Sequence, residues 1–137
     1  MKRKEIKEIC IIEDDKIQIF LLKKFIEKTG LVESVNIYEN GKLAFDEFEA
    51  RSDRGSKFPE IIFLDINMPV WNGWRFYKSF LTLPESSYST MFILTSSLSE
   101  EDKMIANNFG LGDRYLLKPL KFELLKDILN SFCGVLD

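Results

Sequence analysis

Positions 61–69 read IIFLDINMP. Four apolar residues run directly into Asp65, and a turn that ends at Pro69 follows at once. A short apolar run that is bounded by turn residues is typical of a strand buried on both faces of a parallel sheet. The sequence therefore predicts a strand that carries one carboxylate, that of Asp65, to the edge of a sheet.

Three further apolar runs end in a polar side chain in the same way. They are residues 9–12 before Glu13-Asp14-Asp15, residues 91–94 before Thr95, and residues 115–117 before Lys118-Pro119. Longer segments of helical period separate the runs, which predicts βα units and a parallel sheet. Because right-handed crossovers place the carboxyl ends of parallel strands at one edge, we expect the four polar ends to meet there.

The whole pattern predicts one doubly wound α/β domain made of five βα units. We expect strands at residues 8–13, 34–38, 61–65, 91–95 and 114–117, and helices at residues 16–29, 42–50, 74–83, 100–108 and 121–132. Gly30 should end the first helix, and residues 97–100 fit a capping box for the fourth. Residues 51–59 are polar and are interpreted as a surface loop.

Length and composition indicate a single globular domain. The 137 residues, 45% hydrophobic and 30% charged, are expected to form one domain over residues 1–137, with a core from about residue 6 to residue 133. The net charge of −3 comes from interspersed acids and bases, so no basic surface for nucleic acid is predicted. The apolar runs are too short to span a membrane, and no signal peptide is recognised, so a cytoplasmic location is expected.

The chain has no histidine and two cysteines. The absence of histidine excludes Ser-His-Asp and Cys-His catalysis, the common zinc sites and a role as a phosphohistidine donor. Cys10 and Cys133 lie far apart in the sequence and are expected to be reduced packing residues.

The polar strand ends form a chemically coherent set. If the strands before Glu13 and Asp65 are neighbours, three carboxylates including Asp14 crowd together. Two charges 4 Å apart cost about 1 kcal/mol in water and about 4 kcal/mol at an effective dielectric near 20. Such a cluster favours a hard divalent cation, Mg²⁺ or Mn²⁺. With the ammonium of Lys118 and the hydroxyl of Thr95, the set suits phosphoryl transfer to Asp65.

Each of these residues also has a simpler structural interpretation. Asp14 or Asp15 alone would usually be a helix cap, Lys118 followed by proline a loop, and Thr95 an ordinary β-branched strand residue. Four polar strand ends in this order are difficult to explain as turn formers, and they favour the functional interpretation.

These residues resemble the receiver domain of two-component response regulators, of the single-domain, chemotaxis-receiver type, over nearly the whole chain. The matching segments are residues 11–15 (IIEDD), 64–69 (LDINMP) with Gly73, 94–96 (LTS) and 117–119 (LKP). Asp-x-x-Met-Pro followed by glycine is more specific than the other segments. The resemblance implies a flavodoxin-like (βα)5 fold with strand order 2-1-3-4-5.

The resemblance implies an acceptor and a metal site. Asp65 looks like the phospho-acceptor, and Glu13 and Asp14 look like the acidic pair, with Asp14 as a direct ligand of Mg²⁺. Asn67 looks like the residue whose backbone carbonyl completes the protein ligands, which then are Glu13, Asp14, Asp65 and Asn67. Mn²⁺ is an alternative ion.

The resemblance also implies a switch. Thr95 and Tyr115 look like the switch pair, and Lys118 looks like the lysine that bridges the phosphoryl group. Asn67 and Ser97 look like the positions that tune dephosphorylation. Phosphorylation would then remodel a surface made of the fourth helix, the fifth strand and the fifth helix.

The implied function is that of a phosphoacceptor that assists its own phosphorylation and dephosphorylation, rather than an enzyme. Its partners would be a histidine kinase or histidine phosphotransfer protein and a downstream protein target. No direct contact with nucleic acid or with a membrane is expected, and no output domain is expected. A homodimer through the surface of the last two βα units is left open.

Two other classes of function are considered. A receiver-like binding module would keep the fold without phosphorylation, but the intact set of acids, Thr95 and Lys118 speaks against it. An aspartyl-nucleophile phosphohydrolase usually needs a second acid two residues after the nucleophile, and Asn67 stands there.

Two features depart from the compact family pattern. The span from Asp14 to Asp65 is longer, and residues 51–59 are expected to hold the excess, away from the site. Trp71 and Trp74 add large apolar groups beside the acceptor. We interpret them as anchors that pack the start of the following helix on the sheet; the alternative is a rim that limits water or contacts a kinase.

Overall fold

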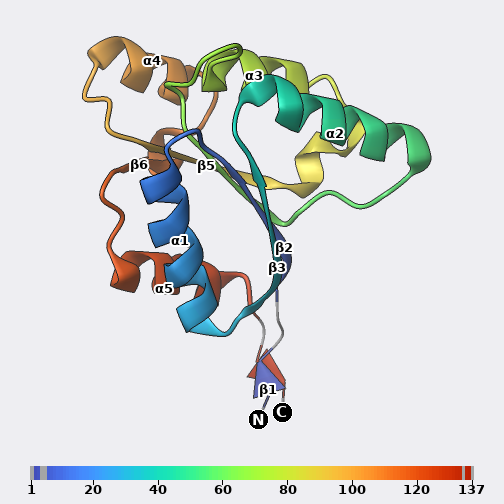
Figure 1. Cartoon of the computed structure of the whole chain (residues 1–137), viewed down its shortest axis with the longest axis vertical. Coiled ribbons are helices and arrows are strands. Elements are labelled where there is room, and N and C mark those ends of the chain that lie inside the picture. Colours follow the sequence, from blue (N-terminus) through green and yellow to red (C-terminus); the bar gives the residue numbers. More distant parts are fainter. Residues whose placement is uncertain (1, 4–5, 134, 137) are drawn as a thin grey trace.

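The structure, a computed structural model, describes residues 2–3, 6–133 and 135–136. Its main sheet has five strands, β2 (Ile6–Ile12), β3 (Val32–Tyr38), β4 (Ile61–Leu64), β5 (Thr90–Thr95) and β6 (Tyr115–Leu117). They lie in the order β3-β2-β4-β5-β6, and every neighbouring pair is parallel (Figure 1). Counted along the chain, this is the order 2-1-3-4-5, so the predicted doubly wound fold is confirmed.

Helices cover both faces of this sheet (Figure 1). One face carries α1 (Lys16–Thr29) and α5 (Phe122–Ser131). The other carries α2 (Gly41–Arg54), α3 (Gly73–Phe80) and α4 (Glu100–Asn108). Two short 3-10 helices, η1 (Pro84–Tyr88) and η2 (Gly112–Arg114), precede β5 and β6. Because the five strands of the main sheet are parallel, their carboxyl ends all lie at one edge of that sheet.

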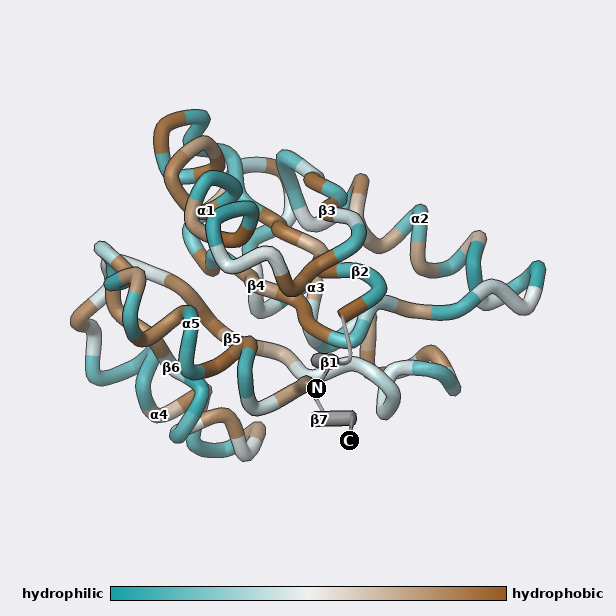
Figure 2. Tube along the Cα trace, turned by 90° about the horizontal axis from the view of Figure 1, so that it is seen from below, coloured by the Kyte–Doolittle hydropathy of each residue, from teal (hydrophilic) through white to brown (hydrophobic). Residues whose placement is uncertain are grey.

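The alternation of side chains along the strands divides the core into two parts. In β4, Ile61 and Phe63 pack toward α1 and α5, whereas Ile62 and Leu64 pack toward α2, α3 and α4. All four are buried, as the predicted two-sided strand requires. The strands accordingly form the hydrophobic centre of the molecule, with hydrophilic segments mainly on the helices and loops around it (Figure 2).

A second, two-stranded sheet pairs β1 (Lys2–Arg3) with β7 (Val135–Leu136) in antiparallel orientation. It lies at the opposite end of the molecule from the carboxyl ends of the main sheet (Figure 1). The sequence pattern did not predict it. Among the described helices, none combines the length and apolar character needed to span a membrane.

The predicted loop from residue 51 is wrong in its first part, because α2 continues to Arg54 and ends at Gly55 in the left-handed conformation (φ 71°). Arg51 is 8% exposed. Its guanidinium binds Glu8 of β2 through two nitrogens, each at 2.7 Å, and its Nε binds Glu47 at 2.8 Å. A charged residue is buried here because carboxylates from two elements compensate it.

Three smaller differences concern helix ends and strand bounds. Helix α3 ends at Phe80, not Leu83, and the polar connection after it contains η1. The N-cap of α4 is Ser99, whose Oγ accepts from the Asp102 amide at 3.2 Å, so the predicted box from Ser97 is displaced by two residues. The strands shift by up to two residues at their ends. The predicted bounds of α1 and α4 are confirmed.

Candidate functional site

The sheet places Glu13 and Asp65 side by side. Ile12 and Leu64 are paired in the β2–β4 register, and each is followed by its acid. The Asp65 amide donates to the Ile12 carbonyl at 2.9 Å, which extends the ladder by one residue. Glu13 is 4% and Asp65 6% exposed, whereas Asp14 is exposed. Two buried carboxylates and one exposed carboxylate therefore share this edge.

The three acids form a compact cluster. One carboxylate oxygen each from Glu13, Asp14 and Asp65 lies within 4.8 Å of the other two. Backbone amides hold the two buried carboxylates in place. Glu13 Oε2 accepts from the amides of Asp14 and Asp15 at 3.1 and 3.2 Å, and Asp65 Oδ1 accepts from the Asn67 amide at 3.2 Å.

Lys118 supplies the cation of this cluster. Its amide donates to the Thr95 carbonyl at 2.9 Å, one position beyond the β5–β6 pairing of Thr95 with Leu117. Its Nζ lies 2.5 Å from Glu13 Oε1 and 3.7 Å from Asp65 Oδ2. Burial raises the pKa of Glu13, while the hydrogen bond from Lys118 opposes that rise. One ammonium thus faces both buried acids.

The donor set fits a hard divalent cation. Three carboxylates with one oxygen each in mutual reach match the all-oxygen preference of Mg²⁺ and Mn²⁺. Mg²⁺ keeps several waters and takes few protein ligands, so a partly open cluster suffices. Asp14 is the exposed member of the cluster, so an ion would reach the cluster from its side.

Thr95 belongs to an adjoining hydrogen-bonded group. It is fully buried, and its Oγ1 accepts from the Ser97 amide at 3.2 Å. The Tyr115 hydroxyl donates to the Ser97 carbonyl at 3.0 Å, and burial raises the pKa of Tyr115. The structure therefore brings Thr95, Ser97 and Tyr115 together, and the backbone of Lys118 joins them to the acids.

The two tryptophans both pack against the fold. Trp74 is 8% exposed and stacks on Phe109, with ring centroids 6.1 Å apart. Trp71 is half-buried; its ring lies 5.6 Å from that of Phe45, and the Arg75 guanidinium lies 4.4 Å from its centroid. The burial and stacking of Trp74 confirm its predicted anchoring, and for the half-buried Trp71 both the anchor and the rim stay predictions.

Gly73 is required by a close approach of two backbones. A Cβ built on Gly73 would lie 2.5 Å from the Asp65 carbonyl oxygen, and the Gly73 amide donates to the Ile66 carbonyl at 3.1 Å. The start of α3 therefore packs closely against the backbone of Asp65 and Ile66. In the same loop Val70 adopts φ 68°, which is strained for a β-branched residue.

Sequence reasoning missed Asp102. Its carboxylate accepts from the Trp74 indole at 2.9 Å and from the Ser97 hydroxyl at 2.6 Å. The only sequence signal was the spacing of Ser99 and Asp102, which marks a helix start and gives no indication of contact with another helix.

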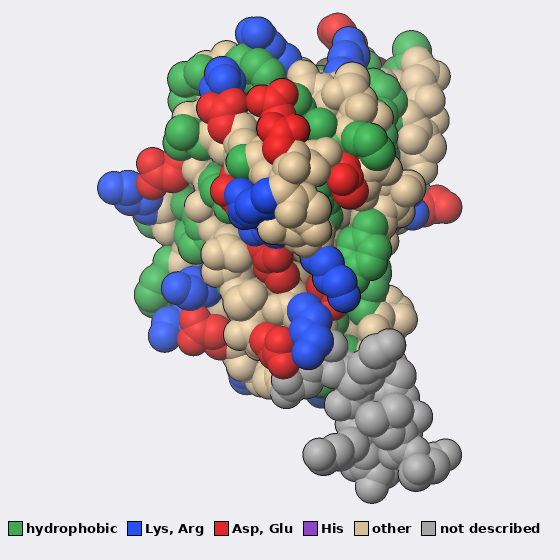
Figure 3. Space-filling model, turned by 90° about the vertical axis from the view of Figure 1, so that its right-hand side faces the viewer, with side chains coloured by type: hydrophobic (Ala, Val, Ile, Leu, Met, Phe, Trp, Pro, Cys, Tyr) green, Lys and Arg blue, Asp and Glu red, His purple; other side chains and the backbone are tan. Residues whose placement is uncertain are grey.

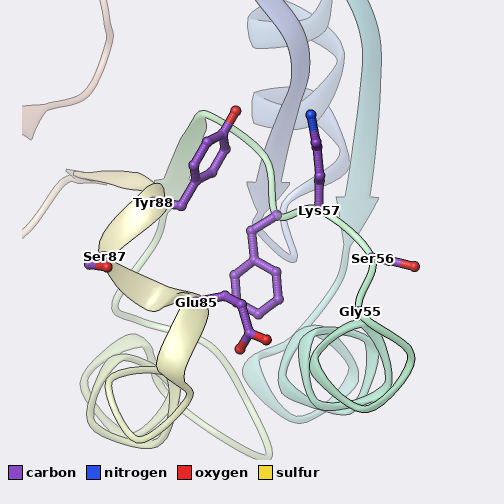
Figure 4. A pocket seen from close by; sticks show the side chains of 7 residues that line it. Gly55, Ser56, Lys57, Glu85, Ser87 and Tyr88 are labelled. Atoms are coloured by element: carbon purple, nitrogen blue, oxygen red, sulfur yellow. The ribbon is translucent and has the colours of Figure 1, made fainter.

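A cavity of about 440 Å³ lies elsewhere, between the end of α2 and η1 (Figure 4). Its lining residues are Gly55, Ser56, Lys57, Phe58, Glu85, Ser87 and Tyr88. None of them belongs to the acidic cluster. The candidate site is therefore recognised by its chemistry and its place at the strand ends, not by volume.

Comparison with known proteins places the chain in a family. The family model of the response regulator receiver domain matches residues 9–130. The chain belongs to this family. The crystal structure of a two-component response regulator from Cytophaga hutchinsonii is 31% identical, covers 93% of this chain and 97% of that chain, and has a TM-score of 0.80. The protein PilH of Pseudomonas aeruginosa is 29% identical over 90% of this chain and 94% of its own length.

A second similar structure is the Mn²⁺-bound form of the response regulator Rcp1. It is 23% identical, covers 92% of this chain and 91% of that chain, and has a TM-score of 0.72. At this identity the similarity shows a shared fold alone.

Proposed function

We propose that this receiver accepts a phosphoryl group on Asp65 from the phosphohistidine of a histidine kinase or histidine phosphotransfer protein. The observation that carries the proposal is the meeting of Glu13, Asp14 and Asp65 with the ammonium of Lys118 at one edge of the sheet. The acyl phosphate would then change a docking surface formed by α4, β6 and α5. The downstream target binds that surface.

The chemistry assigns a role to each oxygen of Asp65. Oδ1 accepts from the Asn67 amide, whereas Oδ2 faces Lys118, so we assign Oδ2 to the attack on phosphorus. The new P–O bond replaces the P–N bond, and the donor imidazole leaves. Glu13, Asp14, Asp65 and the Asn67 carbonyl would hold a Mg²⁺ or Mn²⁺ ion, which supplies positive charge to the phosphoryl oxygens.

Lys118 and Thr95 would respond to the added charge. An acyl phosphate carries about two negative charges near neutral pH, as phosphate monoesters do. Lys118, which faces both acids, would move from Glu13 toward the phosphoryl group. The Thr95 hydroxyl would turn to the same group and release the Ser97 amide, and Tyr115 would turn inward.

The exposed apolar side chains support two docking surfaces. Leu98, Met104 and Leu117 are 68%, 63% and 44% exposed on the α4 and β6 side, which suits a protein target. Ile17, Phe20 and Leu21 share one exposed face of α1, directly after the acids, which suits the phosphoryl donor.

The remaining assignments follow from the same proposal. Asn67 and Ser97 tune the lifetime of the acyl phosphate, which the receiver helps to form and to hydrolyse. The net charge is −3, and acidic and basic side chains are intermixed on the face shown in Figure 3, so we propose no direct contact with nucleic acid. We further propose that the receiver domain acts in the cytoplasm on protein partners.

Intact mass spectrometry tests the proposal. The protein is incubated with acetyl phosphate and Mg²⁺, with Asp65→Asn as the control. One phosphoryl adduct is expected on the wild type and none on the variant. No adduct, even with phosphorylated histidine kinases, would support a binding module that keeps the fold without phosphorylation. Rapid turnover of a small phosphoester would support a phosphohydrolase.

A further inference from the structure

We propose that Asp102 is a positioning residue that couples the switch hydroxyl of Thr95 to helix α3, through Ser97 on one side and Trp74 on the other. The inference rests on the proposed function, because the change that Asp102 transmits is the turning of Thr95 toward a phosphoryl group on Asp65.

A chain of hydrogen bonds joins these four residues. Thr95 Oγ1 accepts from the Ser97 amide at 3.2 Å, and the Ser97 hydroxyl donates to Asp102 Oδ2 at 2.6 Å. The other oxygen of Asp102, Oδ1, accepts from the Trp74 indole at 2.9 Å. The carboxylate therefore bridges two segments, the loop between β5 and α4 and the start of α3.

The two residues at the ends of this series of hydrogen bonds, Thr95 and Trp74, are both buried. Thr95 is fully buried, and Trp74 is 8% exposed and stacked on Phe109. Trp74 directly follows Gly73, where a Cβ would lie 2.5 Å from the carbonyl oxygen of Asp65. The start of α3 thus contacts the backbone of Asp65 through Gly73. Through the indole of Trp74 and the carboxylate of Asp102, it is also linked to the loop between β5 and α4.

The coupling follows from the cost of an unpaired buried donor. If Thr95 turns away, the Ser97 amide loses its acceptor and residue 97 can shift. Because the Ser97 hydroxyl is bonded to Asp102, the carboxylate must follow or break that bond. If it follows, the buried indole of Trp74 must move with it or lose its acceptor, which is costly. The loop and α3 are therefore expected to move together.

Trp74 fluorescence tests the coupling directly. The chain has two tryptophans, so Trp71→Phe leaves Trp74 as the reporter. In this background, labelling with acetyl phosphate and Mg²⁺ should shift Trp74 emission in proportion to the adduct seen by mass. Asp102→Ala should label equally and lose that shift. Asp102→Leu, which fills a similar space but has no acceptor for either bond, serves as the second variant if Asp102→Ala does not fold, and it should lose the shift in the same way.

The matched control is Glu101→Ala, which removes an exposed acid from the same helix turn and should keep the shift. An equal shift in the Asp102 variants, or none in Trp71→Phe despite full labelling, would overturn the inference. A failure to label would instead overturn the proposed function.

A double-mutant cycle tests the coupling without phosphorylation. Ser97→Ala and Trp74→Phe each remove one bond to Asp102, and their effects on the unfolding equilibrium are compared with that of the double variant. Substitutions within one hydrogen-bonded network have non-additive effects on stability. The unfolding equilibrium constant of the double variant is therefore expected to differ by about threefold or more from the product of the two single effects. Additive effects would show that Asp102 does not connect the two segments.

Discussion

Lys118 Nζ lies 2.5 Å from Oε1 of Glu13 and 3.7 Å from Oδ2 of Asp65. The ammonium is thus bonded to Glu13, which we assign to metal binding. It also lies close to Asp65, which we assign as the acceptor. The side chains of Lys118 and Glu13 are 12% and 6% exposed, so little solvent screens the pair.

Removing this cation should destabilise the protein. Lys118→Gln leaves the buried carboxylate of Glu13 without its partner, and breaking a buried pair from one side costs about 3 kcal/mol. Urea unfolding without added metal measures the change. Lys126→Gln, an exposed lysine of α5, is the control and should stay within about 0.5 kcal/mol of the wild type. Equal stability of the two variants would show that the pair contributes little.

Divalent ions should stabilise the folded chain through the acidic cluster. An ion that binds only the native state adds about 2.7 kcal/mol at a concentration one hundred times its Kd. Thermal unfolding of the wild type should therefore shift upward with Mg²⁺, and Asp14→Asn should reduce the shift strongly. Asp15→Asn is the matched control, because Asp15 caps α1 and asparagine caps equally well. Equal shifts in both variants would contradict the ligand assignment.

The buried Arg51 should make stability depend on pH. Its hydrogen bond lowers the pKa of Glu47 below the ordinary value. The folded state therefore binds that proton less readily than the unfolded state. The ionised Glu47 contributes fully to the free energy of unfolding above the usual glutamate pKa of about 4.3. This contribution is lost as the pH falls through the lowered pKa of Glu47. Glu47→Gln should flatten this part of the curve in urea unfolding at several pH values.

Glu49→Gln, an exposed acid of the same helix, is the control for that experiment and should leave the pH dependence unchanged. If the Glu47 and Glu49 variants lose stability in parallel between pH 3 and 6, a range around the usual glutamate pKa of about 4.3, the pairing with Arg51 is not the cause.

Thr95 should be needed for the switch and not for the labelling. Thr95→Ala keeps the acids and Lys118, so acetyl phosphate should still label it, but it lacks the hydroxyl that turns to the phosphoryl group. Hydrogen exchange of α4, β6 and α5 should then no longer change on labelling, and the downstream target should bind with unchanged affinity. Thr95→Ser, which keeps the hydroxyl, should respond as the wild type does. A full response by Thr95→Ala would remove Thr95 from the mechanism.

Local patterns predicted the βα units and the acids at the strand ends, and the family resemblance implied the strand order that brings those acids together. Gly30 ends α1 in the left-handed conformation, and the buried run before Asp65 brings that carboxylate to the sheet edge. The burial of Arg51 depends on Glu8, 43 residues away in the chain, and the link from Trp74 to Asp102 joins two helices. No local period or cap reports such contacts, so the loop prediction at residue 51 was wrong and Asp102 was missed.

The most direct measurement of the central claim locates the modified residue. The protein is treated with acetyl phosphate and Mg²⁺, reduced with borohydride, which converts an aspartyl phosphate to homoserine, and read by tandem mass spectrometry. Homoserine is expected at position 65 only, and only when Mg²⁺ is present. Homoserine at another acid such as Asp14, or at no position despite an intact-mass adduct, would contradict the assignment of Asp65 as the acceptor.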